Sequence, residues 1–115
     1  MAGAPLGTSI VTVLRPIQTV KDAYGNEVPD RRNVVYIDLR GCAVHPDPGA
    51  ETLPSGRDVV MMGWRVHAPG SADVRATDQV RFAGVVYEVD GEPRVWPAPW
   101  GGVHHTEFRL KAVLG

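Results

Sequence analysis

The sequence predicts a small all-β fold, an antiparallel β-barrel or sandwich with long loops and little helix. The chain has 13 Gly and 10 Pro distributed along 115 residues, a spacing of breaks that short strands tolerate and long helices do not. Two segments alternate between apolar and polar residues, and none sustains the 3.6-residue apolar period of a helix. At this length we expect one domain, 1–115, with a flexible N-terminal segment over about residues 1–8.

The N-terminal half is expected to supply several short strands. Apolar and β-branched runs predict them at 9–14, 33–39 and 41–45. Within the segment 20–28, Tyr24-Gly25-Asn26 lies between apolar ends. Such a cluster predicts a turn or the tip of a hairpin.

The strongest strand signal lies at 59–68. One face would carry Val60, Met62, Trp64, Val66 and Ala68. The opposite face would carry Gly63, Arg65 and His67. We therefore expect a strand with one buried and one solvated side, with Trp64 in the core.

The C-terminal third predicts another alternating strand and a hairpin. The strand would bury Thr106, Phe108, Leu110, Ala112 and Leu114 and expose Glu107, Arg109 and Lys111. Upstream, strands at 79–82 and 85–90 are separated by Ala83-Gly84. Two residues are the length of a tight hairpin loop, with glycine available for a positive φ.

Two irregular segments, 46–56 and 92–105, are long for so small a domain. Long ordered loops on a rigid β frame are frequent functional sites. The first segment contains Asp47, Gly49, Glu51 and Ser55. In the second, the candidate protein-contact residues are Trp96, Trp100 and His104. The two tryptophans either fold back onto the core or meet a partner, and the sequence leaves both open.

Composition argues against several classes of function. The formal net charge of -1 provides no positive field for a nucleic-acid backbone. The single cysteine, Cys42, cannot form an intramolecular disulfide and lacks the second thiol of most structural zinc sites. No apolar run reaches the roughly 20 residues that span a bilayer, and the N-terminus lacks signal-peptide features. We expect synthesis in the cytoplasm and no membrane partner.

No catalytic, cofactor-binding or metal site is expected. The serines and Cys42 lie in no recognisable nucleophile motif. The pair His104-His105 invites a metal site, but neighbours on a strand point to opposite faces and cannot easily share one ion. We therefore interpret the pair as solvated or as part of an interface, and we expect that the protein is not an enzyme.

A family resemblance covers most of the chain. Residues 56–93, GRDVVMMGWRVHAPGSADVRATDQVRFAGVVYEVDGEP, resemble the central part of head-to-tail connector proteins of long-tailed phages that infect actinobacteria. Upstream, VLRPIQTVKDAYGNEVPD at 13–30 and GCAVHPDP at 41–48 are similar to the N-terminal half of the same proteins. Each motif is a turn and alternation signature, and their order adds to the resemblance.

The resemblance implies a stopper protein of the virion neck. It implies a small β-barrel that forms a ring, expected to be hexameric, between the head-tail adaptor and the tail terminator or tail tube proteins. By its position after GCAVHP, the segment 46–56 resembles the family's stopper loop. The resemblance therefore implies the candidate channel residues Asp47, Gly49, Glu51 and Ser55. The acids of this segment would face packaged DNA and repel the phosphates, so that DNA passes without specific binding. A solvated surface loop is the other interpretation of this segment.

The sequence leaves three other functions open. A tail-terminator or adaptor subunit of the same siphovirus particle is the nearest, although adaptors of this type are usually helical. A small β-barrel binding module is more remote, because it would show aromatics interleaved with Lys and Arg on one sheet face. The chain has only two lysines, Lys21 and Lys111. An enzyme subunit is last, because no cluster suggests a cleft with perturbed titratable groups.

Overall fold

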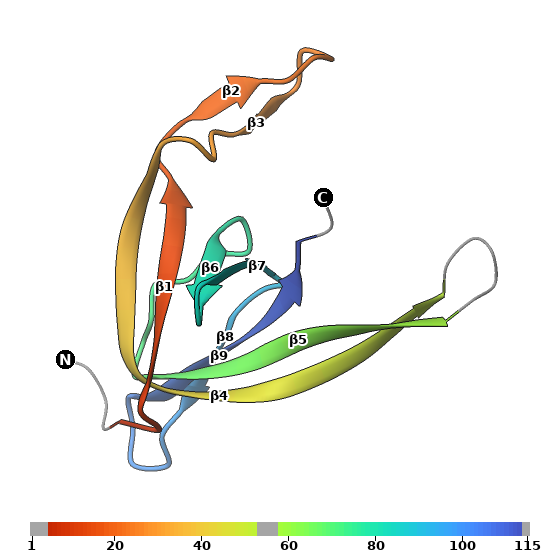
Figure 1. Cartoon of the computed structure of the whole chain (residues 1–115). Helices are drawn as coiled ribbons and strands as arrows, with labels where there is room; N and C mark the ends of the chain where they lie inside the picture. The colour runs from red at the N-terminus through yellow and green to blue at the C-terminus, as the bar shows by residue number, and fades with distance from the viewer. Residues whose placement is uncertain (1–4, 53–57, 114–115) are drawn as a thin grey trace.

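The chain folds as a β-barrel from which three hairpins project (Figure 1). The computed structural model describes residues 5–52 and 58–113, and all regular structure in these ranges is strand. The strands are β1 (Ser9–Pro16), β2 (Thr19–Lys21), β3 (Glu27–Pro29), β4 (Val34–Thr52), β5 (Asp58–Pro69), β6 (Gln79–Phe82), β7 (Val85–Val89), β8 (Arg94–Pro97) and β9 (Val103–Ala112). In these residues no helix is long and apolar enough to cross a membrane.

Six antiparallel strands close the barrel. Their order is β5-β4-β1-β6-β7-β9, and β9 pairs again with β5 to complete the circle. β8 pairs with the N-terminal part of β9, and β2 pairs with β3 in a separate two-stranded sheet. The buried core comprises Val11, Val13, Cys42, Val66, Ala68, Val74, Val80, Val89, Phe108 and Leu110. The predicted small all-β fold is confirmed, and closure leaves few unpaired strand edges.

The alternating segments form strands as predicted, while Leu114 and the side chains of Val60 and Met62 lie outside the described residues. In β5, Val66 and Ala68 point into the core, and in β9, Phe108 and Leu110 do the same. Trp64 is partly buried and packs against this core, with its ring 5.1 Å from that of Phe82. β6 and β7 form the expected hairpin. Its two turn residues, Ala83 and Gly84, have φ angles of 51° and 81°, as a type I′ turn requires.

Strand β4 corrects two predictions. It is one strand through Thr52, so neither a separate strand at 41–45 nor a loop over 46–56 is present in the described residues. Its first part pairs with β1, and from Ala43 to Thr52 it pairs with β5. Gly41, with a φ of 69°, lies where the partner changes.

The prolines of β4 explain why this segment resembles a loop in sequence. Pro46 and Pro48 lie two residues apart, so their missing N–H groups fall on the same edge of the strand. Beyond Ala43, the described part of β4 has a strand partner on one edge only. A strand with a free edge tolerates proline, because an N–H missing from that edge removes no ladder hydrogen bond.

Gly63 is also placed differently from the prediction. It was expected on the solvated face of β5, but it is buried. A Cβ at this position would overlap the backbone carbonyl oxygen of Leu110 in β9. Glycine here therefore permits the close approach of β5 and β9 that closes the barrel.

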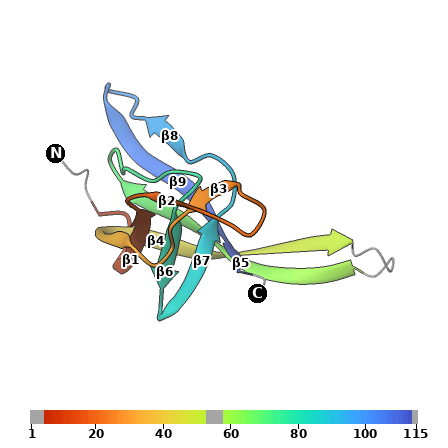
Figure 2. The same ribbon diagram turned by 90° about the horizontal axis from the view of Figure 1, so that it is seen from above.

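Three hairpins extend away from the barrel. The β2–β3 hairpin, the β4–β5 ribbon and the β8–β9 hairpin point in different directions, and the ribbon and the β8–β9 tip lie on opposite sides (Figures 1 and 2). The molecule measures 48 × 36 × 25 Å along its principal axes. The described ribbon consists of Ala43–Thr52 paired with Asp58–His67, and we call its part beyond Asp47 and Gly63 the β4–β5 arm.

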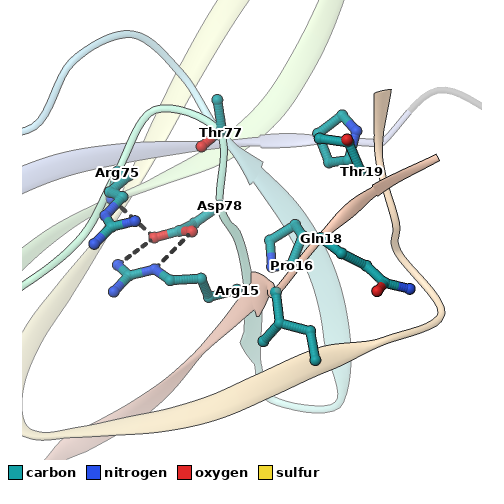
Figure 3. A pocket seen from close by; sticks show the side chains of 9 residues that line it. Arg15, Pro16, Gln18, Thr19, Arg75, Thr77 and Asp78 are labelled. Carbon is teal, nitrogen blue, oxygen red and sulfur yellow. Dashed lines mark hydrogen bonds and ion pairs between the residues drawn. The ribbon is translucent and has the colours of Figure 1, made fainter. Parts of the chain in front are cut away.

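An ion pair fixes the segment before β6 against β1. Arg15 donates to both carboxylate oxygens of Asp78, at 3.2 and 2.8 Å, and also to Asp73 at 2.7 Å. The Asp78 carboxylate additionally accepts the backbone N–H of Arg75, at 2.9 Å. Figure 3 shows Asp78 between the two arginines, in the wall of a pocket of about 320 Å³. The hydrogen bond with Asp78 raises the pKa of Arg15, despite the opposing effect of burial.

The β2–β3 hairpin is braced at its base by Asp30. This buried carboxylate accepts hydrogen bonds from Gln18 at 2.9 Å, Asn33 at 2.7 Å and the backbone N–H of Arg32 at 3.1 Å. These bonds, that from Gln18 foremost, lower the pKa of Asp30 below its ordinary value of 3.8. The ionised form of Asp30 therefore contributes to stability.

This brace predicts an acid-sensitive contribution to folding. Because the folded-state pKa of Asp30 is lowered, its contribution is present above pH 3.8 and is lost as the pH falls through the folded value. We expect Asp30→Asn to lower the free energy of unfolding at neutral pH. The loss between neutral and strongly acidic pH should be smaller in this variant than in the wild type. Urea unfolding at both pH values measures the difference, and equal losses would contradict the assignment.

Candidate protein-contact surface

The tip of the β8–β9 hairpin presents an exposed tryptophan on a tight turn. Ala98 N–H donates to the Gly102 carbonyl, and Gly101 N–H donates to that of Ala98, both at 3.0 Å. Gly101 and Gly102 have positive φ angles, which this turn uses. Trp100 is 80% exposed, and its ring lies edge-on to His104 at a centroid distance of 6.3 Å. The turn is closed by hydrogen bonds on both sides of Trp100.

Trp96 lies nearby on β8 and is held in place. Its ring is 43% exposed and stacks on His105, with centroids 6.2 Å apart and planes at 17°. Its indole Nε1 donates to Oε2 of Glu107 at 3.0 Å. The segment 92–105 is therefore not one long loop, because β8 pairs with the start of β9. Neither Trp96 nor Trp100 folds back into the core.

The exposed apolar side chains of this hairpin are candidate contacts for a partner, and we call the exposed part of the hairpin the β8–β9 surface. Its exposed large apolar residues are Val95, Trp96, Trp100 and Val103. A rigid hairpin loses little conformational entropy when a partner covers it. Exposed tryptophans are enriched among the residues that dominate protein interfaces. The sequence signal for this surface was the pattern Trp96-Pro97-Ala98-Pro99-Trp100.

The histidine pair corrects the expected geometry. His104 and His105 were expected on opposite faces of a strand, but their Nδ1 atoms lie 2.8 Å apart. The register between β8 and β9 shifts at this point, since Trp96 pairs with His105 and Pro97 with Val103. A bulge places two neighbouring residues opposite one, so the usual alternation is interrupted. His104 thereby contacts both Trp100 and His105.

An ionic network fixes the base of the β4–β5 arm. Asp47 accepts a hydrogen bond from Arg109 at 2.6 Å and lies 3.6 Å from Arg65. Arg65 also lies 3.4 Å from Glu107. Asp47, a candidate channel residue, is thus an anchor of the outer sheet face. Gly49 and Glu51 lie further along β4, and Ser55 lies outside the described residues.

The electrostatics of Glu107 follow from its neighbours. Burial raises the pKa of Glu107, but hydrogen bonds from Trp96 and His67 and the charge of Arg65 outweigh it, so the pKa is lowered overall. The adjoining depression has a volume of about 500 Å³ and is lined by Arg65, Asp90, Gly91, Glu92, Arg94, Glu107, Phe108 and Arg109. Charged groups of both signs therefore surround it.

The single cysteine lies in the core. Cys42 is fully buried, and burial raises the pKa of its thiol to about 11. Its Sγ lies 3.5 Å from the carbonyl oxygen of Leu39. Cys42 therefore serves as a small core residue.

Comparison with known proteins gives a partial structural likeness to a phage-element protein. No protein-family profile matches the chain, and no curated protein matches it. The solved structure of the phage-like element PBSX protein xkdH from Bacillus subtilis is 16% identical, with a TM-score of 0.47. The match covers 90% of this chain and 92% of that one. The barrel itself is established by the strand pairing of the present chain.

Proposed function

We propose that the chain is a non-enzymatic structural subunit of a tailed-phage virion, a stopper-type protein of the head-to-tail connector that assembles into a ring. The motifs at 13–30, 41–48 and 56–93 support the family. The observation that carries the stopper role is the β4–β5 arm, a two-stranded extension that continues beyond the closed barrel (Figure 1). A ring of barrels with arms directed inward would narrow a central channel.

The arm and the β8–β9 surface suit different tasks in such a ring. The arm is anchored by the pairing of Asp47 with Arg65 and Arg109, so its direction from the barrel is fixed at the base. The tip of the β8–β9 hairpin points away from the arm (Figures 1 and 2). We assign this surface to contact with a neighbouring virion protein and the arm to the channel. Because Asp47 is paired with cations, acids that repel DNA phosphates would have to lie further along the arm.

The channel role is tested by shortening the arm. Gly49 and Met61 are cross-strand partners, so residues 50–60 can be replaced by Asn-Gly while the Asp47 network is kept. We expect rings to assemble and attach to portal-adaptor complexes as in the wild type, while filled heads lose DNA. DNA retention in purified heads, measured by nuclease sensitivity, gives the result.

The matched control shortens a different hairpin. Residues 22–26 between β2 and β3 can be replaced by Asn-Gly, because Lys21 and Glu27 are cross-strand partners. This variant should retain DNA. If the arm variant formed rings and its heads retained all of their DNA, the arm would not be the part that closes the channel.

The β8–β9 surface predicts an effect on assembly. We expect Trp100→Ala to weaken association with portal-adaptor complexes by about 2 kcal/mol, or roughly thirtyfold, as for an interface tryptophan. Folding should be unaffected, because the ring is 80% exposed. The control is Tyr24→Ala, a large aromatic that is 89% exposed on the β2–β3 hairpin. Sedimentation of mixtures compares them, and equal association for wild type and Trp100→Ala would contradict the assignment.

The tail-terminator alternative makes a different prediction in the same mixtures. A terminator subunit would associate with tail tubes and not with portal-adaptor complexes. The adaptor alternative is disfavoured because residues 5–52 and 58–113 contain no helix. Sedimentation with each of the two assemblies therefore separates the stopper from the terminator.

A further inference from the structure

All four histidines of the chain meet on the outer face of the barrel. His45, His67, His104 and His105 are its only histidines. Ring centroids are 5.7 Å apart from His45 to His67, 5.2 Å from His67 to His105 and 5.1 Å from His105 to His104. They come from β4, β5 and β9, up to 60 positions apart in sequence. The four histidines lie close together only because of the register in which β4, β5 and β9 pair.

Two of these histidines share a small space with a carboxylate. His67 of β5 is the direct cross-strand partner of Glu107, and His105 lies two residues before Glu107 on β9. One ligand atom from each of His67, His105 and Glu107 lies within 4.8 Å of the other two. All three side chains are half-buried. We infer that His67, His105 and Glu107 form a binding site for a divalent transition metal of the zinc type.

The distances are close to those of a coordination sphere. Nε2 of His67 lies 3.4 Å from Oε1 of Glu107. Zinc bonds of about 2.0–2.1 Å in tetrahedral geometry separate neighbouring ligand atoms by about 3.3–3.4 Å. His105 then has to approach by at most about 1.4 Å, which small side-chain rotations provide. Two histidines and one glutamate leave a fourth position for water.

Neighbouring side chains already orient these ligands. Trp96 donates its N–H to Oε2 of Glu107, which leaves Oε1 facing His67. The same indole stacks on the ring of His105. The Nδ1 of His105 lies 2.8 Å from that of His104. Partners that fix the orientation and tautomer of a ligand are typical of protein metal sites.

One neighbour opposes a cation. Arg65 lies 3.4 Å from Oε1 of Glu107, the oxygen assigned to the metal. Arg65 also lies 3.6 Å from Asp47, so it has an alternative partner when a metal displaces it. Removing the charge of Arg65 should therefore strengthen metal binding. A general loss of structure would not have this effect.

The site is tested by calorimetric titration of the full chain, freed of metal by EDTA, with zinc chloride near neutral pH. We expect one ion per chain and a rise in the thermal midpoint when zinc is added. His67→Ala and His105→Ala should each weaken binding by roughly 100-fold, and Trp96→Phe by about 10-fold to 100-fold. Arg65→Gln should bind more tightly than the wild type.

The matched control is His45→Ala, which removes a histidine of the same cluster that is not a ligand and should leave affinity and stoichiometry unchanged. Thermal midpoints in EDTA must be equal for variants that are compared, so that a folding defect is not taken for a lost ligand. Cobalt(II), whose visible absorption reports coordination geometry, gives a second readout. The inference is overturned by no binding, by several ions per chain, or by equal affinity in wild type and His67→Ala. The metal site does not depend on the proposed virion role, since purified chain alone suffices.

Discussion

Replacing Gly63 by alanine is expected to destabilise the barrel by about 3 kcal/mol, the upper part of the range for overpacking. The added Cβ would overlap the carbonyl oxygen of Leu110. This obstacle is backbone, so no side-chain rotation relieves it. Strands β5 and β9 would have to separate where they close the barrel. Urea unfolding followed by tryptophan fluorescence measures the change.

A second glycine supplies the control for this experiment. Gly91 has a φ of 81°, and nothing lies within 4 Å of its added Cβ. Gly91→Ala should therefore cost only the left-handed strain of about 1–2 kcal/mol. If Gly63→Ala proved no more destabilising than Gly91→Ala, the close approach of β5 to β9 would be wrong.

The fold was predictable where the local pattern and the burial agree. Strands β5 and β9 have one core face each, so their period-2 alternation revealed them. The Ala83-Gly84 turn revealed the β6–β7 hairpin because its length and its glycine are typical of a tight hairpin loop, and both residues do take a positive φ. A strand that is buried on one face alternates apolar and polar residues. This alternation can be recognised without knowing the partner strand.

The β4–β5 arm shows where such signals fail. Pro46, Pro48 and Gly49 have the composition of a loop, yet the chain continues as a strand paired with β5. The evidence for this strand is the distant partner and the free edge, and neither is visible in a local window. The burial of Gly63 could not be predicted from a local window either, because it depends on the carbonyl of Leu110, 47 positions later.

The sequence did not predict the cluster of His67, His105 and Glu107, for a related reason. The alternation placed His67, Glu107 and Arg65 on solvated faces, but it gave no pairing of β5 with β9. Only that pairing sets His67 opposite Glu107. The bulge at His104 then brings two neighbours together that a regular strand would separate. Tryptophans 96 and 100 were found because a Trp-Pro-rich hairpin is a local feature.

The second large effect is expected at Asp78. Its carboxylate is fully buried and binds Arg15 through two hydrogen bonds, while the side chain of Arg15 is only 12% exposed. Asp78→Ala would leave that guanidinium without its main partner and the N–H of Arg75 without its acceptor. Removing one member of a buried pair costs about 3–5 kcal/mol, because the other charge remains desolvated.

The effect of Asp78→Ala is measured against a variant that removes the other acid beside Arg15. Asp73 also bonds Arg15, but its side chain is 67% exposed, so Asp73→Ala should cost about 1 kcal/mol or less. Both substitutions remove one carboxylate from the same arginine, so the contrast reports the burial of Asp78 together with its bond to the N–H of Arg75. The double replacement Arg15→Met with Asp78→Leu should recover part of the loss, since no charge then remains buried. If Asp73→Ala and Asp78→Ala unfolded at the same urea concentration, burial of the Arg15–Asp78 pair would not be what holds residues 72–78 against β1.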